Sequence, residues 1–406
     1  MNAYARMVRY KRLMRLSDVV LLSGGDGMTP DVEELLTDTI SARIDKEFPD
    51  PNAEEQEIIA GLKDKDLKFV PRIIKSHNDG EIFVQVGGNV RRKDVHLFYN
   101  FGDTVRDEVA LYRFGDALKR AGVGSATVYV PYLIDQRQDK KDDGRVSIAI
   151  ASLMKGLEVN FGPRLERIVT SDLHARQIQG LFDGPLDELS AIEDFAAFYK
   201  DKFSGELAKK NPKIVIISPD AGGAKRAQKL AELLGVQYVT LDKRRTGHGE
   251  AEHRYFLPMD VKGMKAIMID DIIDSAGSVA GEFENPKKQE GPVQYLQSRG
   301  AEVYVCATHA VFSEKNGIAA EERLRKSGAQ VLVTDSIQKG AEYYHRHEDW
   351  LTTLSFGYPL AKAFYCNVVG TSISEFISGR QMNLTADKLN FALKRTGSGV
   401  YIVDGE

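Results

Sequence analysis

Residues 268–278 have the sequence Met268-Ile269-Asp270-Asp271-Ile272-Ile273-Asp274-Ser275-Ala276-Gly277-Ser278. The apolar, β-rich run Ala266–Ile269 predicts a strand, and two carboxylates follow it directly. In α/β folds ligands bind at the carboxyl edge of the sheet, where this order places both carboxylates. The small, hydroxyl-bearing segment Asp274–Ser278 then leads into a helix-like segment, and helix N-termini bind phosphate. We therefore expect a site for a phosphorylated sugar; an ordinary strand–turn–helix connection with an Asp N-cap is the alternative.

The composition limits the class of protein. The chain has 406 residues, enough for two or three domains, with 42% hydrophobic and 28% charged residues. Its net charge of −4 provides no basic field, so we expect no nucleic-acid partner. The sequence shows neither a signal peptide nor an apolar run of transmembrane length, which predicts no membrane partner and a cytoplasmic location. Cys306 and Cys366 stand among apolar neighbours and are expected to be buried free thiols in a reducing compartment.

The fold class follows from the alternation of short β-branched runs with longer amphipathic segments. This pattern predicts βαβ units, and hence an α/β fold with largely parallel sheets flanked by helices. Helical periodicity is clearest in Val105–Arg120 and Ala224–Leu234. The strand candidates are Asp94–Tyr99, Ala126–Pro131, Arg167–Ser171, Lys213–Ser218, Gln237–Leu241, Lys265–Ile269, Glu302–Ala307 and Gln330–Thr334.

A polar stretch around Glu188–Phe203 and Asn211 predicts a division into two α/β halves. We assign residues 1–67 to an N-terminal extension with the first elements of the N-terminal domain. Residues 68–195 form the N-terminal α/β domain in this division, residues 196–370 the C-terminal α/β domain, and residues 371–406 a C-terminal segment and extension.

Two further strand ends carry residues suited to a metal–phosphate ligand. Asp220 lies in the segment Ser218–Arg226, where two adjacent glycines let the backbone approach a phosphate and the carboxylate can hold Mg²⁺. A tight strand-to-helix turn explains this segment equally well. His174 follows Asp172 at another strand end, and an imidazole beside a carboxylate can hold a metal or a triphosphate oxygen. A lone histidine is more often a structural residue.

The segment Leu241–Glu250 contains three adjacent cations, Lys243, Arg244 and Arg245, in an expected loop with two glycines. Cations on a flexible loop can close over a transferring phosphoryl group and neutralise its charge. A solvated basic loop is the alternative, and the position of the segment between two phosphate-type strand ends favours the functional interpretation.

The segment 136–145 is dense in charges of both signs and follows the predicted strand Ala126–Pro131. Arg137 and Lys140 could grip the phosphates of a nucleotide while Gln138 or Asp139 recognises its polar edges. A solvated loop is an equally good explanation when the segment is taken alone.

Taken in order, these segments resemble the ribose-phosphate diphosphokinase family, the phosphoribosyl pyrophosphate (PRPP) synthetases. The resemblance extends from about residue 68 to residue 380. The segments that carry it are Asn78-Asp79-Gly80-Glu81, Asn89-Val90-Arg91, Arg137-Gln138-Asp139-Lys140, Asp172-Leu173-His174-Ala175, Gln177-Ile178-Gln179-Gly180, Ser218-Pro219-Asp220-Ala221-Gly222-Gly223, Asp242-Lys243-Arg244-Arg245, Asp270-Asp271, Ala307-Thr308-His309, Phe312-Ser313 and Ser372-Ile373-Ser374.

The resemblance implies two similar phosphoribosyltransferase-like domains with the active site between them. Members transfer the diphosphoryl group of ATP to O1 of ribose 5-phosphate, with Mg²⁺, and give PRPP and AMP. ATP and ribose 5-phosphate are therefore the expected substrates and Mg²⁺ the expected cofactor. The resemblance also implies a homo-oligomer in which one subunit completes the ATP site of its neighbour.

The resemblance carries roles over to individual residues. Asp270 and Asp271 would hold the ribose hydroxyls, and Asp274, Ser275, Ala276, Gly277 and Ser278 would bind the 5-phosphate. His174 and Asp220 would hold the metal–triphosphate, and Lys243 and Arg245 would stabilise the transition state. His174 would be catalytic together with these two cations. Arg137, Gln138, Asp139 and Lys140 would contact ATP, as would Asp79 and Glu81 from a neighbouring subunit. Arg91, Ser372 and Ser374 would form a regulatory phosphate site.

The chain departs from the family pattern at several positions. His77 stands where members have Phe against adenine, and Lys140 replaces an Arg, which exchanges a planar fork for a point charge. The phosphate loop keeps its hydroxyls through Ser275 and Ser278. The segment Asn100–Glu108 lacks the expected Ser/Pro/Asn pattern, so phosphate activation and ADP inhibition stay open.

Two other functions are compatible with parts of this pattern. A non-catalytic regulatory or assembly subunit of the same family would be expected to lose the cations or metal-binding residues, which this chain keeps. A type I phosphoribosyltransferase would share the Asp270–Ser278 loop but would not need His174, Asp220 or the cations of Lys243–Arg245.

Overall fold

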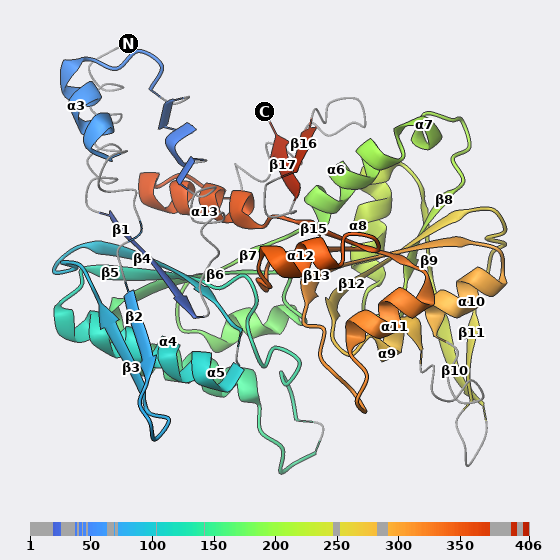
Figure 1. The fold of residues 1–406 in the computed structure, drawn as a ribbon, viewed down its shortest axis with the longest axis horizontal. Coiled ribbons are helices and arrows are strands. Elements are labelled where there is room, and N and C mark those ends of the chain that lie inside the picture. Colours follow the sequence, from blue (N-terminus) through green and yellow to red (C-terminus); the bar gives the residue numbers. More distant parts are fainter. Residues whose placement is uncertain are drawn as a thin grey trace. The chain divides into compact units, whose positions relative to one another are not determined.

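The computed structural model describes residues 19–25, 37–38, 40–42, 44–45, 48–62, 69, 72–102, 104–141, 143–246, 252–281, 291–373, 391–395 and 401–405. The chain forms two compact units (Figure 1). Unit 1 comprises residues 1–189 and 356–382, and unit 2 comprises residues 190–355 and 383–406. Residues 356–370, which the sequence-based division placed in the second domain, thus group with the first unit by their contacts.

Unit 1 is built on a parallel five-stranded sheet of order β1-β4-β5-β6-β7, and β2 and β3 form a separate antiparallel hairpin. Its elements are β1 (Val19–Gly25), α3 (Ala53–Gly61), β2 (Arg72–Ser76), β3 (Ile82–Val86), β4 (Asp94–Asn100), α4 (Thr104–Ala121), β5 (Ser125–Tyr129), α5 (Ala149–Phe161), η2 (Gly162–Arg164), β6 (Leu165–Ser171), η3 (Arg176–Leu181), β7 (Leu186–Leu189) and α13 (Gly357–Val369).

The two faces of the unit 1 sheet are covered by segments far apart in the sequence (Figure 1). Alternate residues of β4, such as Leu97, pack in one core with Phe114 of α4, because successive side chains of a strand point to opposite faces. The other face meets α13, whose Phe364 ring lies 4.8 Å from the His96 ring. The returning helix therefore completes the first unit.

Unit 2 is built on an eight-stranded sheet of order β16-β17-β15-β14-β13-β12-β8-β9, in which β16 alone runs antiparallel to its neighbour. Its elements are α6 (Ile192–Lys202), α7 (Ser204–Leu207), β8 (Ile214–Ser218), α8 (Ala224–Leu234), β9 (Gln237–Thr240), β10 (Asp242–Thr246), β11 (Glu252–Phe256), β12 (Lys265–Ile273), α9 (Gly277–Ala280), α10 (Pro292–Ser298), β13 (Glu302–Ala310), α11 (Ala320–Ser327), β14 (Gln330–Thr334), α12 (Ala341–Arg346), β15 (Leu351–Leu354), β16 (Phe391–Arg395) and β17 (Tyr401–Gly405).

The central strands of unit 2 are apolar on both faces, as buried parallel strands must be. On one face Met268 of β12 packs in a core with Leu296 of α10 and Leu324 of α11. On the other face the Tyr304 ring of β13 lies 5.0 Å from the ring of Phe203, which follows α6. This packing holds the carboxyl ends of β8, β12 and β13 together, because the three strands are hydrogen-bonded neighbours.

The structure confirms the α/β class and every predicted strand and helix, with ends that differ by a few residues. It also contains elements that were not predicted, among them β7, β15 and the antiparallel pair β10–β11. The expectation that Leu241–Glu250 is a loop was wrong for Asp242–Thr246, which pair with Glu252–Phe256 as a hairpin.

Cys306 and Cys366 are buried free thiols, as predicted. Within the described ranges, we find no helix whose length and apolar character would let it cross a membrane.

Candidate active site

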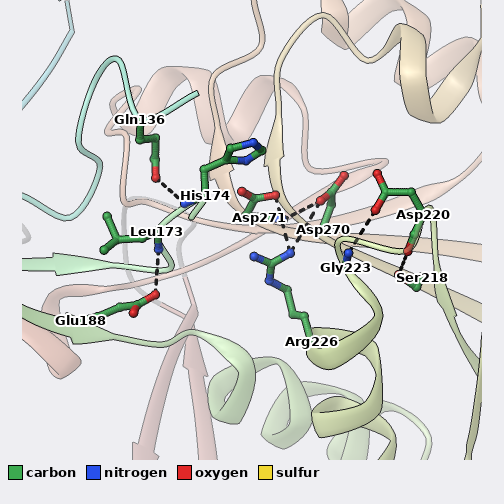
Figure 2. Close-up of polar contacts among 10 residues, drawn as sticks. All are labelled: Gln136, Leu173, His174, Glu188, Ser218, Asp220, Gly223, Arg226, Asp270 and Asp271. Atoms are coloured by element: carbon green, nitrogen blue, oxygen red, sulfur yellow. Dashed lines mark hydrogen bonds and ion pairs between the residues drawn. The ribbon is translucent and has the colours of Figure 1, made fainter. Parts of the chain in front are cut away.

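The two carboxylates Asp270 and Asp271 lie near the end of β12, which runs on to Ile273 instead of ending at Ile269. Asp271 donates its backbone N–H to Asp270 Oδ1 at 2.9 Å. A guanidinium nitrogen of Arg226, Nη1, lies 3.8 Å from Asp270 Oδ1 and 3.6 Å from Asp271 Oδ1 (Figure 2). One cation from α8 therefore faces both acids.

The electrostatics of this pair favour ligands that bring positive charge or hydroxyl donors. Burial raises the pKa of Asp270 well above its ordinary value, and the hydrogen bond and negative charge of Asp271 raise it further. Arg226 acts in the opposite direction. Sugar hydroxyls that donate to the ionised carboxylates would stabilise the charged forms.

The loop that follows β12 presents its backbone amides. Ala276 has a φ of 59°, a left-handed conformation that alanine rarely adopts. The carbonyl oxygens of Ser275, Ala276 and Gly277 all accept hydrogen bonds from the protein. No acceptor in the described part of the chain takes the N–H groups of residues 275–278. Such a run of open amides is suited to an anion.

A second loop, residues 311–319, contacts the end of β12 and the loop 274–278 that follows it, which we name the phosphate loop after its proposed role. Phe312 donates its backbone N–H to the carbonyl of Ile273 at 3.1 Å, and the Ser313 hydroxyl donates to Asp274 Oδ1. Asp274 is thus engaged with the protein, whereas the amides that follow it stay open to an anion.

Asp220 lies in the turn between β8 and α8 and is exposed. Its Oδ1 accepts the backbone N–H of Gly223 at 3.0 Å, while the Ser218 hydroxyl donates to its backbone carbonyl at 2.6 Å (Figure 2). A Cβ on Gly223 would stand 2.9 Å from Ser218 Oγ, so a larger residue there would displace the hydroxyl that holds the turn. Asp220 Oδ2 has no partner among the described residues and is available to a ligand.

His174 lies in unit 1, after β6, on a segment fixed by side chains from two other places (Figure 2). Its backbone N–H donates to Gln136 Oε1 at 2.8 Å, and that of Leu173 donates to Glu188 Oε1 at 3.0 Å. Gln136 is 1% exposed. Burial raises the pKa of Glu188, and the hydrogen bond from the Leu173 N–H lowers it in part.

The segment 137–140 adjoins the His174 segment. Gln177 Nε2 donates to Asp139 Oδ2 at 2.6 Å, so two of the expected ATP-contacting segments are joined. Arg137, Gln138 and Lys140 are exposed beside this contact.

The remaining predicted positions lie on other segments of the chain. Asp79 and Glu81 form the exposed turn of the β2–β3 hairpin, where Glu81 donates its N–H to Asp79 Oδ1 at 3.0 Å. Arg91 is exposed just before β4, and Ser372 follows α13; Ser374 lies outside the described residues. The backbones of Lys243 and Arg245 lie in β10, and their side chains lie outside the described part of the structure.

Sequence reasoning missed four residues that shape these segments: Gln136, Glu188, Arg226 and Arg323. Gln136 and Arg226 belong to segments that were singled out, but neither received a role. Glu188 was assigned only to the polar stretch that separates the two predicted halves. Arg323 lies on the buried face of α11 with Ala320, Leu324 and Ser327, and a charged residue at helical spacing from Ala320 and Leu324 is the signal that could have found it.

Comparison with known proteins agrees with this architecture. A model of the N-terminal domain of ribose phosphate pyrophosphokinase matches residues 50–160, and a phosphoribosyl transferase domain model matches residues 186–283. The fold is similar to the crystal structure of phosphoribosylpyrophosphate synthetase from Mycobacterium smegmatis, with a TM-score of 0.64 and 28% identity, over 86% of this chain and 98% of that chain. These matches define the class: a protein of two phosphoribosyltransferase-type α/β domains.

Curated relatives narrow the class. Ribose-phosphate pyrophosphokinase of Fusobacterium nucleatum is 38% identical over 65% of this chain and 77% of its own length. The Prochlorococcus marinus protein of the same name is 36% identical over 76% of this chain and 86% of its own. The chain belongs to the ribose-phosphate pyrophosphokinase (PRPP synthetase) family.

Proposed function

We propose that this chain is a ribose-phosphate diphosphokinase that converts ATP and ribose 5-phosphate into PRPP and AMP. In this reaction O1 of the sugar forms a bond to the β-phosphorus of ATP. The bond between that phosphorus and the oxygen bridging it to the α-phosphorus breaks, and AMP leaves with that oxygen. The proton of the sugar hydroxyl is released to water. Because charge develops mainly on the transferring phosphoryl group, the step needs positioning and charge neutralisation more than a strong base.

The observation that carries the proposal is the order of groups on one strand end of unit 2. The carboxylates of Asp270 and Asp271 come first and suit sugar hydroxyls. The open amides of residues 275–278 follow and suit a phosphate. Ribose 5-phosphate has hydroxyls at one end of the sugar and a phosphate at the other. These groups match the carboxylates and the open amides, respectively.

The segments of unit 1 support an ATP-binding role. The exposed Arg137 and Lys140 can neutralise phosphates, and Gln138 and Asp139 offer polar contacts to the nucleotide. In our proposal Asp79 and Glu81, on the exposed β2–β3 turn, contact the adenine bound to a neighbouring copy of the chain. The active form is then a homo-oligomer.

Mg²⁺ fits the available donors. No three His, Cys, Asp or Glu side chains converge within the described ranges, and a protein cage is not needed, because Mg²⁺ uses one or two carboxylates together with substrate phosphates. In our proposal Asp220 holds the ion with its open Oδ2, and His174 contacts the metal–triphosphate. When bound, the ion neutralises charge on the transferring phosphates.

Lys243 and Arg245 are proposed to neutralise the charge that develops on the transferring group. Arg91, Ser372 and Ser374 are proposed to bind regulatory phosphate. The two buried free thiols and the use of ATP support a cytoplasmic location.

Product analysis tests the function. Purified protein is incubated with ATP, ribose 5-phosphate and Mg²⁺, with and without inorganic phosphate, and ³¹P NMR follows the products. Formation of AMP and PRPP in equal amounts supports the proposal, and a phosphate requirement supports the regulatory site. Folded protein that forms no AMP under either condition, but binds an active synthetase, would instead be a regulatory subunit.

A further inference from the structure

Arg323, on α11, is buried although it carries a charge. The residue is only 3% exposed. Buried arginines normally pair with carboxylates, because an unpaired charge is costly to remove from water. Within the described part of the chain, however, every contact of Arg323 is to a backbone carbonyl. This unusual arrangement indicates that the hydrogen-bond donors of Arg323 have a function here, because an apolar residue such as leucine would fill a buried position at lower cost.

The three carbonyls come from two loops. Nη1 donates to Ser275 in the phosphate loop at 3.2 Å and to Ile318 at 3.0 Å, and Nη2 donates to Lys315 at 2.6 Å. The last two residues belong to the loop 311–319. One guanidinium therefore joins the phosphate loop to its supporting loop, and its rigid fork fixes both.

The bond to Ser275 sets the direction of the next amide. The described chain has no cis peptide bonds, and in a trans peptide the C=O and the following N–H point in opposite directions. Holding the Ser275 carbonyl toward Arg323 thus turns the Ala276 N–H away from it, toward the side of the loop that carries no protein acceptor among the described residues. The left-handed φ of 59° at Ala276 is strained and needs such support.

We propose that Arg323 is a positioning residue for the sugar-phosphate substrate. Arg323 holds the Ser275–Ala276 peptide so that the Ala276 amide faces the 5-phosphate. The charge of Arg323, which pairs with no carboxylate among the described residues, stabilises that dianion. The inference rests on the proposed function, because it assigns the loop 274–278 to the phosphate of ribose 5-phosphate.

The test compares Arg323→Gln with Arg325→Gln, which removes the same charge two residues along the same helix. Arg325 has a side chain 69% exposed, which pairs with Asp349 at 3.0 Å. We expect Arg323→Gln to raise KM for ribose 5-phosphate about 10- to 100-fold, the effect of losing charge-assisted hydrogen bonds. KM for ATP should be unchanged, and Arg325→Gln should behave as the parent protein.

An unchanged KM for ribose 5-phosphate in Arg323→Gln would overturn the proposal. An equal rise in both KM values would overturn it too, because a general loss of structure would affect both substrates. Circular dichroism shows whether the variant folds. Should it not fold, Arg323→Lys keeps the charge without the fork, and a smaller rise confined to ribose 5-phosphate is expected; equal rises again contradict the proposal.

Binding separates this inference from the proposed function. If the parent protein forms no PRPP, the proposed reaction fails, but calorimetric titration with ribose 5-phosphate still tests the loop. Weaker binding by Arg323→Gln than by Arg325→Gln would support the positioning role, and equal binding would refute it.

Discussion

The His174 segment of unit 1 and the phosphate loop of unit 2 use their backbones in opposite ways. In the first, the N–H groups of Asp172, Leu173 and His174 donate to Leu189 O, Glu188 Oε1 and Gln136 Oε1. In the second, the carbonyls of residues 275–277 are engaged and the amides are open. A segment whose amides are occupied can act only through its side chains, whereas a segment whose carbonyls are occupied presents a row of donors.

This difference suggests how one fold serves two ligands. In our proposal the first segment offers an imidazole to a metal–triphosphate, and the second binds a phosphate through its backbone dipoles. Side chains from outside fix each segment, and their chemistry matches the backbone groups they hold. A carboxamide and a carboxylate accept the amides of the first segment, and a guanidinium donates to a carbonyl of the second.

The largest effect on activity should come from removing Lys243, a cation that belongs to neither the His174 segment nor the phosphate loop. We expect Lys243→Ala to lower kcat about 10²- to 10³-fold, the usual scale for one lost transition-state donor. Both KM values should change little, which would set β10 apart from the two binding segments. Steady-state kinetics measure this, with the exposed Lys210→Ala in the same unit as control. Near-normal turnover would rule out this role for Lys243.

The next effect concerns the amide-occupied segment. Gln136→Met removes the buried acceptor of the partly buried His174 N–H, at a cost of about 1–3 kcal/mol. We therefore expect KM for ATP to rise about tenfold or more while KM for ribose 5-phosphate is kept. Gln228→Met, at an exposed position on α8, is the matched control. A change in the KM for ribose 5-phosphate alone would contradict the assignment of the His174 segment to ATP.

Asp270 predicts a pH-dependent stability. A carboxyl with a pKa raised by folding stabilises the native state at pH below its ordinary value of 3.8, and this contribution is lost as pH rises through the folded value. Asp270→Asn cannot ionise, so it should lose activity yet melt at a higher temperature than the parent at pH 8. Near pH 4 the difference should shrink. Thermal melts across pH measure it, and a lower melting temperature at pH 8 would contradict the assignment.

The smallest effect should come from Ala276→Gly. Glycine relieves about 1–2 kcal/mol of left-handed strain but costs about 0.5–1 kcal/mol in chain entropy, so the free energy of unfolding should rise by about 0–1.5 kcal/mol. The loop also becomes less preorganised, and KM for ribose 5-phosphate should rise a few-fold. Urea titration and kinetics check both; a marked loss of stability would show that Ala276 is not strained.

Much of this arrangement could be predicted from local sequence. Apolar runs such as Ala266–Ile269 mark buried parallel strands, and the polar residues after them must gather at one sheet edge. That reasoning placed Asp220 and Asp270 at the carboxyl edge of a sheet before any contact was known. It failed for β7, because Leu186-Asp187-Glu188-Leu189 is short and polar and is a strand only through its pairing with β6.

The supporting residues could not be found in this way, because their roles depend on long-range contacts. Glu188 meets Leu173 across 15 residues, and Arg323 meets Ser275 across 48. The return of α13 to unit 1 likewise depends on packing of Phe364 against His96, which no local pattern encodes. Local sequence thus points to candidate ligand-contacting groups, whereas the residues that hold their segments in place emerge only from the structure.

The division between the two segments is tested most directly by measuring both KM values side by side in Gln136→Met and Arg323→Gln. The predicted result is a crossed pattern: the first variant loses affinity for ATP and keeps it for ribose 5-phosphate, and the second does the reverse. Variants that each weaken both substrates equally would contradict the division, and so would variants that weaken neither.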